Sequence, residues 1–204
     1  MNAKVEFFFD LSSPWTCLAF HNIRPVVAKH GAAIVWRPIL VGGVFNAVNP
    51  AVYAAREDMR GPKARHYAKS LKDWAALAGV TMRFPSPHHP LKSVLAMRAC
   101  CALEEDQDAL EHFAEAAFTA YFTGQANLDD PAILAGIADA AGFDGQALIA
   151  RTQEQAVKDR LRSNTEEVIA RGGYGSPSIF VNGDDMYFGN DQLPLIEAKI
   201  KAAR

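Results

Sequence analysis

The sequence predicts an α/β fold in which two short α/β units, one at each end of the chain, enclose a long helical segment. Three observations predict it: a strand–helix–strand pattern over residues 5–38, a helical pattern from 44 to about 172, and a strand–strand–helix pattern after 178. The end units together read βαβ…ββα, the pattern of a thioredoxin-like fold interrupted by a large all-helical insertion. The expected division is a thioredoxin-like domain of 1–45 and 172–204 and a helical insertion domain of 46–171.

The first unit begins with the apolar run 5–9, which predicts a strand. Apolar residues then recur at helical spacing over 14–30, and Gly31 is a helix stop. Pro25 inside this helix predicts a kink or a short break near 20–21, because proline removes a hydrogen bond and crowds the preceding turn. Residues 33–38 complete the unit as a second strand, which we expect to be parallel to the first.

The middle of the chain is rich in Ala, Leu, Glu and Lys, with breaks at proline and glycine. Asp130-Pro131 is typical of an N-cap followed by proline at the first helical position, and Asp144 is a second candidate cap. The predicted helices are 63–78, 93–104, 109–122, 131–141 and 145–170. After them, 178–181 and 186–188 predict a hairpin around the Asn182-Gly183 turn, and a final helix is expected from about Asp191.

Charge and cysteine usage exclude several classes of partner. The formal net charge of -2 and the pI of about 6.3 give no reason to expect nucleic acid, and no apolar run is long enough to span a bilayer. The chain passes from Met1 directly into the first strand, so no leader peptide is expected. Cys17, Cys100 and Cys101 have no metal-ligand spacing, so we expect no metal site and three reduced, buried thiols in a cytoplasmic protein.

The turn Ser13-Pro14-Trp15-Thr16 joins the first strand to the first helix. Thiol enzymes with a thioredoxin-type fold place a CxxC motif here, and neither end of this turn is a cysteine, so any thiol must come from elsewhere. Ser13 has two interpretations that the motif leaves about even. It is either an N-cap with no other role, or a hydroxyl donor to an anion such as a thiolate, which the helix dipole and free amides favour.

Two downstream segments also have a purely structural and a functional interpretation. Ser176-Pro177 is an ordinary strand entry, or a cis bond that exposes the Ser176 backbone toward the first helix for pairing with a peptide-like ligand. The combination with Ser13 favours the second. Gly189-Asn190-Asp191 caps the last helix. Its amides and Asn190 also suit a carboxylate, and Asp191 suits the ammonium group of an amino-acid end.

The remaining candidates are weaker. The rigid loop 84–90 carries His88 and His89 without the spacing of a metal site, and a pocket-lining position is only slightly favoured over simple surface exposure. A basic helical region also has two interpretations. Most of its charges are expected to be solvated, and on the functional interpretation one or two of them attract an anionic substrate. These basic residues are Lys63, Arg65, Lys69, Lys72, Lys92 and Arg98. Trp15, Trp36 and Trp74 are predicted to belong to the core, although Trp15 follows the Ser13 turn closely.

With these segments placed, the chain resembles the glutathione-dependent 2-hydroxychromene-2-carboxylate isomerases, relatives of the kappa-class glutathione transferases in the DsbA-like thioredoxin superfamily. The matching segments are Phe9-Asp10, Ser13-Pro14-Trp15-Thr16, Asn49-Pro50, Pro62-Lys63-Ala64-Arg65, Leu71-Lys72-Asp73-Trp74-Ala75, Phe84-Pro85, Ser176-Pro177 and Phe188-Gly189-Asn190-Asp191. They cover essentially the whole chain. The sequence departs from the family at Lys92, where many relatives have asparagine, and at His66, which with Tyr67 replaces a tyrosine.

The resemblance implies glutathione as cofactor, a small aromatic hydroxy or keto acid as substrate, and a homodimer. Ser13 matches the catalytic serine that hydrogen-bonds the glutathione sulfur and favours its thiolate. Ser176, before Pro177, matches the residue whose backbone pairs with the cysteinyl part. Further implied glutathione contacts are Asn49, Gly189, Asn190 and Asp191. Candidate substrate contacts are Trp15, Lys63, His88 and Lys92.

The implied reaction interconverts 2-hydroxychromene-2-carboxylate and trans-o-hydroxybenzylidenepyruvate by reversible addition of the thiolate, which divides one slow isomerisation into easier steps. Two alternatives stay open. One is a kappa-class-like transferase that conjugates electrophiles with glutathione. The other is a redox-inactive thioredoxin-fold module that binds peptides. The missing CxxC argues against a disulfide oxidoreductase, because that chemistry needs a resolving thiol.

Overall fold

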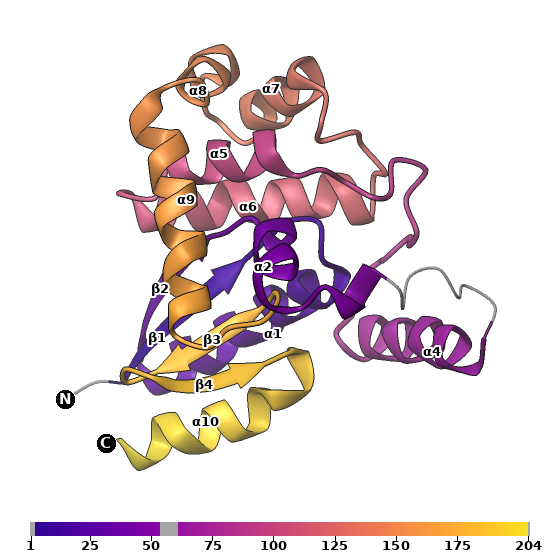
Figure 1. Ribbon diagram of the computed structural model, residues 1–204, viewed down its shortest axis with the longest axis vertical. Helices are drawn as coiled ribbons and strands as arrows, with labels where there is room; N and C mark the ends of the chain where they lie inside the picture. Colours follow the sequence, from indigo (N-terminus) through magenta and orange to yellow (C-terminus); the bar gives the residue numbers. More distant parts are fainter. Residues whose placement is uncertain (1–2, 54–60, 204) are drawn as a thin grey trace.

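The computed structural model describes residues 3–53 and 61–203, and within them four strands form one mixed sheet in the order β2-β1-β3-β4 (Figure 1). β1 (Lys4–Phe9) pairs in parallel with β2 (Ala33–Pro38) and antiparallel with β3 (Ser178–Val181), which pairs antiparallel with β4 (Asp185–Phe188). The predicted parallel pair and the predicted C-terminal hairpin are therefore both confirmed, as is the thioredoxin-like fold with a helical insertion.

The first helix, α1 (Pro14–His30), begins and ends where the sequence predicts. Ser13 is its N-cap, and Gly31 ends it in the left-handed region at φ 57°. Of the kink or short break predicted near 20–21, the break is wrong, because α1 continues through Pro25. Pro25 and His21, one turn earlier, both lie on the exposed side of the helix, where water can replace the hydrogen bond that proline removes.

The helices of the insertion follow the predicted order with two corrections. α4 (Pro62–Leu77), α5 (Val94–Ala102), α6 (Gln107–Phe122) and α7 (Pro131–Ala140) lie within two residues of the predicted ends. The single helix predicted over 145–170 is wrong, because the chain forms α8 (Gly145–Arg151) and α9 (Gln155–Ala170). The buried Thr152 hydroxyl donates to the Ile149 carbonyl at 2.6 Å and closes α8 without any glycine or proline.

The other correction is a helix that the sequence pattern missed, α2 (Val41–Val48). Its first turn contains Gly42 and Gly43, which have low helix propensity. Tertiary hydrogen bonds support it instead, because the Leu40 amide donates to the Thr165 hydroxyl at 3.0 Å and the Val41 amide donates to the Asp10 carboxylate at 2.8 Å.

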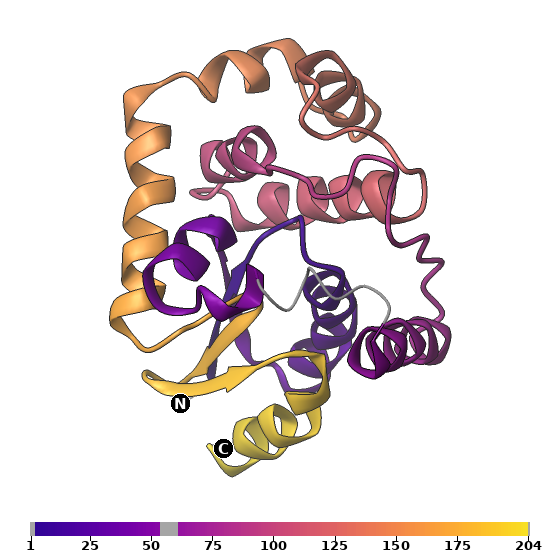
Figure 2. The ribbon, with the colours of Figure 1, turned by 45° about the vertical axis from the view of Figure 1, so that its right-hand side comes forward.

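The sheet is covered on both faces (Figure 2). Alternate side chains of a strand point to opposite faces. Phe8 and Phe180 are buried on one face in a cluster with residues of α2 and α9. Phe7, Phe9 and Ile179 belong to the larger core, which continues through α1, α5 and α6. The division into a domain of 1–45 with 172–204 and an insertion of 46–171 stays a prediction, and residues 1–2, 54–60 and 204 of those segments lie outside the described residues.

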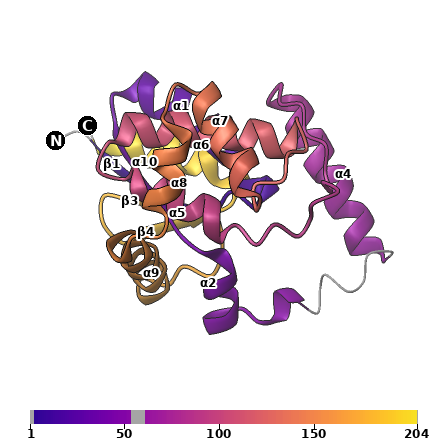
Figure 3. The same cartoon turned by 90° about the horizontal axis from the view of Figure 1, so that it is seen from above.

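Two further parts of the structure lie at the periphery of the fold. After β4, a short 3-10 turn, η1 (Asn190–Gln192), leads into α10 (Leu193–Ala202), and both pack against α1. The final helix is thus preceded by a turn at the residue where the sequence predicted its start. α4 lies to one side of the molecule (Figure 3). It is attached through a small cluster in which its Leu71 and Ala75 pack on Leu18 of α1.

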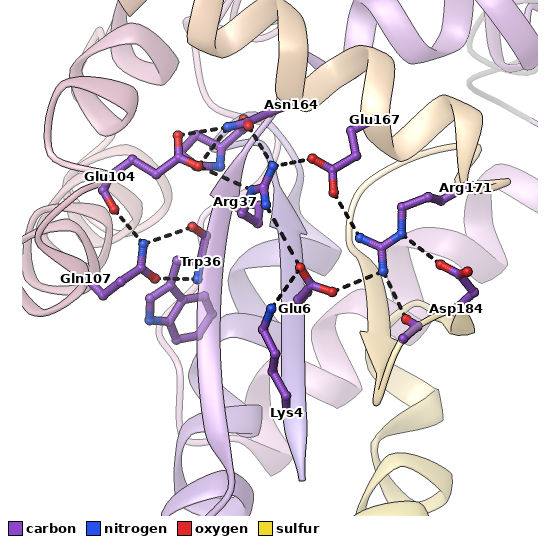
Figure 4. A network of polar contacts seen from close by, with 12 residues as sticks. Lys4, Glu6, Trp36, Arg37, Glu104, Gln107, Asn164, Glu167, Arg171 and Asp184 are labelled. Atoms are coloured by element: carbon purple, nitrogen blue, oxygen red, sulfur yellow. Dashed lines mark hydrogen bonds and ion pairs between the residues drawn. The ribbon is translucent and has the colours of Figure 1, made fainter.

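A polar network ties the sheet to α9 and to the turn after α5 (Figure 4). Arg37 pairs with Glu6, Glu104 and Glu167, and its guanidinium also donates to the Asn164 side-chain oxygen at 2.9 Å. Arg171 pairs with Glu6, Glu167 and Asp184 at 3.1 Å each. We call these residues the edge network: Glu6, Arg37, Glu104, Asn164, Glu167, Arg171 and Asp184. No helix among the described residues is long and apolar enough to span a membrane.

Candidate functional site

The N-terminus of α1 meets the turn before β3, although the two are far apart in sequence. The Ser13 hydroxyl donates to the Ser176 carbonyl at 3.2 Å and accepts from the Thr16 amide at 3.2 Å. The peptide bond between Ser176 and Pro177 is cis, as one interpretation of the sequence expects. Ser13 is therefore an N-cap, and it also contacts the residue before the cis proline.

Ser176 is held from both sides by its own side chain. Its hydroxyl accepts from the Asp10 amide at 2.9 Å and shares a hydrogen bond of 2.8 Å with the Thr16 hydroxyl. Thr16 and Ser176 are both buried. We call Asp10, Ser13, Thr16 and Ser176 the turn cluster. It fixes the strand β1, the start of α1 and the cis-proline turn relative to one another.

The Asp10 carboxylate lies at the starts of three helices. It accepts from the Ser12 amide before α1 at 2.8 Å, from the Val41 amide of α2 at 2.8 Å, and from the hydroxyl of Ser93, the N-cap residue of α5, at 3.0 Å. Complete burial raises the pKa of this carboxyl, and the bonds from Val41, Ser12 and Ser93 oppose that shift. These donors compensate a charge that helix N-termini also favour.

A cavity of about 550 Å³ opens beside the turn cluster, between the cis-proline turn, η1 and α4. Its walls combine an aromatic half with a polar half. The lining residues are Trp15, Lys63, His66, Tyr67, Ser70, Trp74, Ser176, Pro177, Phe188, Gly189, Asn190 and Asp191. Gly175 brings the Phe188 ring close to the cis-proline turn, because a Cβ at Gly175 would lie 2.8 Å from that ring.

Asn190, which lines the polar half, carries an unpartnered donor. Its side chain is 1% exposed, and its oxygen accepts from the Asn22 amide group at 2.9 Å. The Asn190 side-chain nitrogen has no hydrogen-bond partner. A buried donor without a partner is unfavourable, so a ligand oxygen that reached it would be bound. Next to it, Gly189 has φ 98°, and a Cβ there would lie 2.9 Å from the exposed Asp191 carboxylate.

The aromatic half is largely supplied by one face of α4. Lys63, His66, Tyr67, Ser70 and Trp74 follow helical spacing on that face and all line the cavity. Tyr67 meets Trp15 of α1 edge to face, with ring centroids 5.8 Å apart. The His66 ring nitrogen lies 3.4 Å from the Ser70 hydroxyl.

The structure brings most of the predicted site residues to this cavity, and it places three elsewhere. Asn49, at the end of α2, donates from its side chain to the Tyr174 carbonyl at 3.2 Å. His88 and Lys92 are exposed in or just after the loop 84–90. None of these three lines the cavity. Ser13 reaches it only through Ser176, which does line it.

Several lining residues were missed by sequence reasoning. His66, Ser70 and Trp74 were given no site role, although Trp74 stands in a segment that matches the family and His66 is a departure from it. Their shared signal is the helical spacing that places aromatic and polar side chains on one face. Of the three tryptophans predicted to be core, only Trp36 is fully buried at 1% exposure, while Trp15 and Trp74 are half-buried at the cavity.

The three cysteines of the chain are free and buried, as predicted. Burial raises the pKa of Cys17 to about 12 and that of Cys100 well above its ordinary value. It also raises the pKa of Cys101. These thiols stay protonated at neutral pH and are poor nucleophiles. A thiolate at the start of α1 would therefore have to come from a bound molecule. Among the described residues, no group of three or more His, Cys, Asp or Glu is arranged to hold a metal.

One family model matches nearly the whole chain. The family model described as the DSBA-like thioredoxin domain matches residues 4–201, so this chain belongs to that family.

The chain is also similar to isomerases and to glutathione transferases. The 2-hydroxychromene-2-carboxylate isomerase of Sphingobium xenophagum is 28% identical over 199 residues, which cover 97% of this chain and 98% of that protein. The glutathione S-transferase kappa 2 of Caenorhabditis elegans is 24% identical and covers 94% of this chain and 89% of its own. A solved 2-hydroxychromene-2-carboxylate isomerase superposes with a TM-score of 0.81 at 24% identity, over 98% of this chain and 95% of that one. The resemblance stated from the sequence is thus confirmed.

Proposed function

We propose that the chain is a glutathione-dependent isomerase that interconverts 2-hydroxychromene-2-carboxylate and trans-o-hydroxybenzylidenepyruvate, or a related aromatic catabolite. The observation that carries the proposal is the Ser13 hydroxyl at the start of α1, 3.2 Å from the Ser176 carbonyl at the edge of the cavity. A hydroxyl donor and a helix N-terminus together favour a bound thiolate. The relatives with the isomerase name support the reaction type.

The polar half of the cavity fits a γ-glutamyl tripeptide. In this proposal Ser13 donates to the sulfur, and the Ser176 backbone pairs with the cysteinyl part. The contact between Ser13 and Ser176 at the edge of the cavity supports both roles. The unpartnered Asn190 nitrogen is the donor for the γ-glutamyl carboxylate, and the Asp191 carboxylate is the partner for its ammonium group. In this proposal Gly189 and Pro177 shape the same wall. Asn49 supports it indirectly, through its hydrogen bond to the Tyr174 carbonyl.

The aromatic half fits a planar acid. Trp15, Tyr67 and Trp74 offer ring surfaces, and Lys63 offers a positive charge on the same wall. When bound, glutathione supplies the thiolate that adds to the conjugated side chain of the substrate and is released unchanged after rotation. The residues of the chain hold the two molecules side by side, which converts a bimolecular encounter into a positioned reaction. His88 and Lys92 remain candidates for the outer edge of the substrate site.

The test of this function is the acidity of bound glutathione. We expect Ser13→Ala to raise the pKa of the bound thiol, measured as thiolate absorbance against pH, because the variant removes the donor to the sulfur. Ser12→Ala is the matched control. It removes a hydroxyl of the same turn, one that bonds Asp10 and has no hydrogen bond to Ser13 or Ser176, and it should leave the thiol unchanged. An unchanged pKa in Ser13→Ala would remove Ser13 from the mechanism.

A second candidate is a conjugating transferase, which the kappa-class relatives favour. Free thiol measured during turnover separates the two enzymes: isomerisation leaves the glutathione concentration constant, and conjugation depletes it in proportion to product. The third candidate, a redox-inactive peptide-binding module, would replace both if calorimetry found no glutathione binding at millimolar concentration.

The assembly and location of the protein belong to the same proposal. On the family resemblance we propose a cytoplasmic homodimer. Sedimentation equilibrium at micromolar concentration tests the assembly, and a monomer at that concentration would contradict it.

A further inference from the structure

The Ser13 hydroxyl has one proton, and in the structure this proton is already used in a hydrogen bond. That proton is donated to the Ser176 carbonyl at 3.2 Å, while the oxygen accepts from the Thr16 amide. A serine hydroxyl has no second donor to offer. Ser13 can therefore support a sulfur anion only if its proton leaves the Ser176 carbonyl.

Removal of that donor would leave the Ser176 carbonyl without its partner. Ser176 is 7% exposed, and a buried carbonyl that loses its donor carries a desolvation penalty. Ser176 is also one of the residues that line the cavity. A peptide N–H of the ligand is the donor that matches a strand-like backbone carbonyl.

The side chain of Ser176 keeps the carbonyl in place during such a change. The Asp10 amide and the Thr16 hydroxyl hold the Ser176 hydroxyl at 2.9 Å and 2.8 Å, and neither contact involves Ser13. Thr16 is completely buried and occupies the last position of the turn 13–16. Its hydroxyl serves the cis-proline turn, since its own amide already caps the helix through Ser13.

We propose that the site works by an exchange of donors at the Ser176 carbonyl, and that Thr16 is the positioning residue for it. The cysteinyl N–H of the bound tripeptide replaces the Ser13 hydroxyl at the Ser176 carbonyl. Ser13 then turns its proton to the sulfur, and the proton of the thiol leaves to solvent. Binding of the peptide backbone and acidification of the thiol are thereby coupled. This inference rests on the proposed function and adds its switching step.

A ligand analogue tests the exchange in the unaltered protein. The analogue is a glutathione depsipeptide, in which an ester oxygen replaces the cysteinyl N–H and the thiol is kept. We expect the pKa of bound glutathione to fall by about 1 or more from its free value, and the bound depsipeptide to stay within about 0.3 of its own free value, because Ser13 remains on Ser176. Equal acidification of the two bound thiols would overturn the exchange.

Variants at Thr16 test the positioning role. Thr16→Val keeps the shape and removes the hydroxyl, and Thr16→Ser keeps the hydroxyl. We expect Thr16→Val to raise the pKa of bound glutathione by roughly 0.5 to 1, a three- to tenfold loss of thiolate at a given pH, and Thr16→Ser to restore it. A purely structural Thr16 would lower the melting temperature and leave the thiol pKa at its wild-type value. If Thr16→Val does not fold, the depsipeptide comparison decides alone.

The outcomes separate this inference from the function on which it rests. If Ser13→Ala raises the pKa of bound glutathione while the depsipeptide is acidified like glutathione, the donor exchange is wrong and the function stands. If wild-type protein binds no glutathione, the proposed function is wrong and the exchange with it.

Discussion

The turn cluster and the edge network both attach distant helices to β1, but they differ in what they leave available to a ligand. The edge network consists mainly of ion pairs (Figure 4), and none of its residues lines the cavity. The turn cluster consists mainly of hydroxyl and backbone groups, and it reaches the cavity through Ser176. A polar cluster becomes a binding site where it borders a cavity and its hydrogen-bond partners can be exchanged. The other cluster is expected to contribute stability alone.

The largest effect is expected at Arg37, in the edge network. Arg37→Leu removes one partner from each of the carboxylates of Glu6, Glu104 and Glu167. The Arg37 side chain is 18% exposed. We expect the free energy of unfolding in urea to fall by about 2–3 kcal/mol, between the values for an exposed pair and for a broken buried pair. The dissociation constant for glutathione should stay within about twofold (roughly 0.4 kcal/mol), because no residue of the edge network lines the cavity.

The control is Arg37→Lys, which keeps the charge and loses the planar fork, and it should lose less stability. A large change in glutathione affinity for either folded variant would mean that the edge network also serves the site.

The next effect is expected at Asn190, on the cavity side. Asn190→Ala removes the unpartnered donor, so the dissociation constant for glutathione should rise about tenfold to a hundredfold, the range of a hydrogen bond to a charged group. Calorimetry measures it. Asn22→Ala is the matched control, because it removes the partner of the Asn190 oxygen and leaves the free nitrogen. Equal losses in the two variants would show that Asn190 matters only for packing η1 on α1.

A smaller effect is expected on the α4 wall. Tyr67→Ala removes the ring that meets Trp15 edge to face, and such aromatic contacts contribute about 0.5–1.5 kcal/mol. The KM for the aromatic substrate should rise roughly two- to tenfold, with glutathione affinity unchanged. Tyr67→Phe retains the ring and should behave like the wild type. If both variants lose glutathione binding as well, the division of the cavity into an aromatic and a polar half is wrong.

The smallest effect concerns the pH dependence of stability, away from both clusters. Hydrogen bonds from His30, Lys29 and Lys201 lower the pKa of the Glu197 carboxyl from its ordinary 4.5 to about 2. The carboxylate therefore stabilises the folded state above about pH 4.5, and this contribution is lost as the pH falls toward 2. Melting temperatures measured between pH 5 and pH 2 should fall less in Glu197→Gln than in the wild type. An identical pH profile for the two proteins would contradict the assignment.

The sequence predicts the framework of the site better than its walls. β1, α1 and β2 follow from local apolar periodicity and from Ser13 and Gly31 at the helix ends, so they are recovered within one residue. The α8–α9 turn depends on the buried Thr152 hydroxyl, and α2 depends on bonds to residues distant in sequence. Those interactions leave no local pattern.

The same limit applies to the cavity. Ser13, Ser176 and Asn190 stand in recognisable motifs, although the contact between Ser13 and Ser176 spans 163 residues. The face of α4 that lines the cavity is fixed by the packing of Leu71 on Leu18, a tertiary contact. Local periodicity indicates which residues share a helix face, but it does not say what that face meets.

The most direct test of the central claim is a crystal structure of this protein with glutathione bound. The account predicts the sulfur within hydrogen-bond distance of the Ser13 hydroxyl, the cysteinyl N–H on the Ser176 carbonyl, and the γ-glutamyl end between Asn190 and Asp191. A glutathione molecule bound elsewhere, or one whose sulfur points away from Ser13, would contradict it.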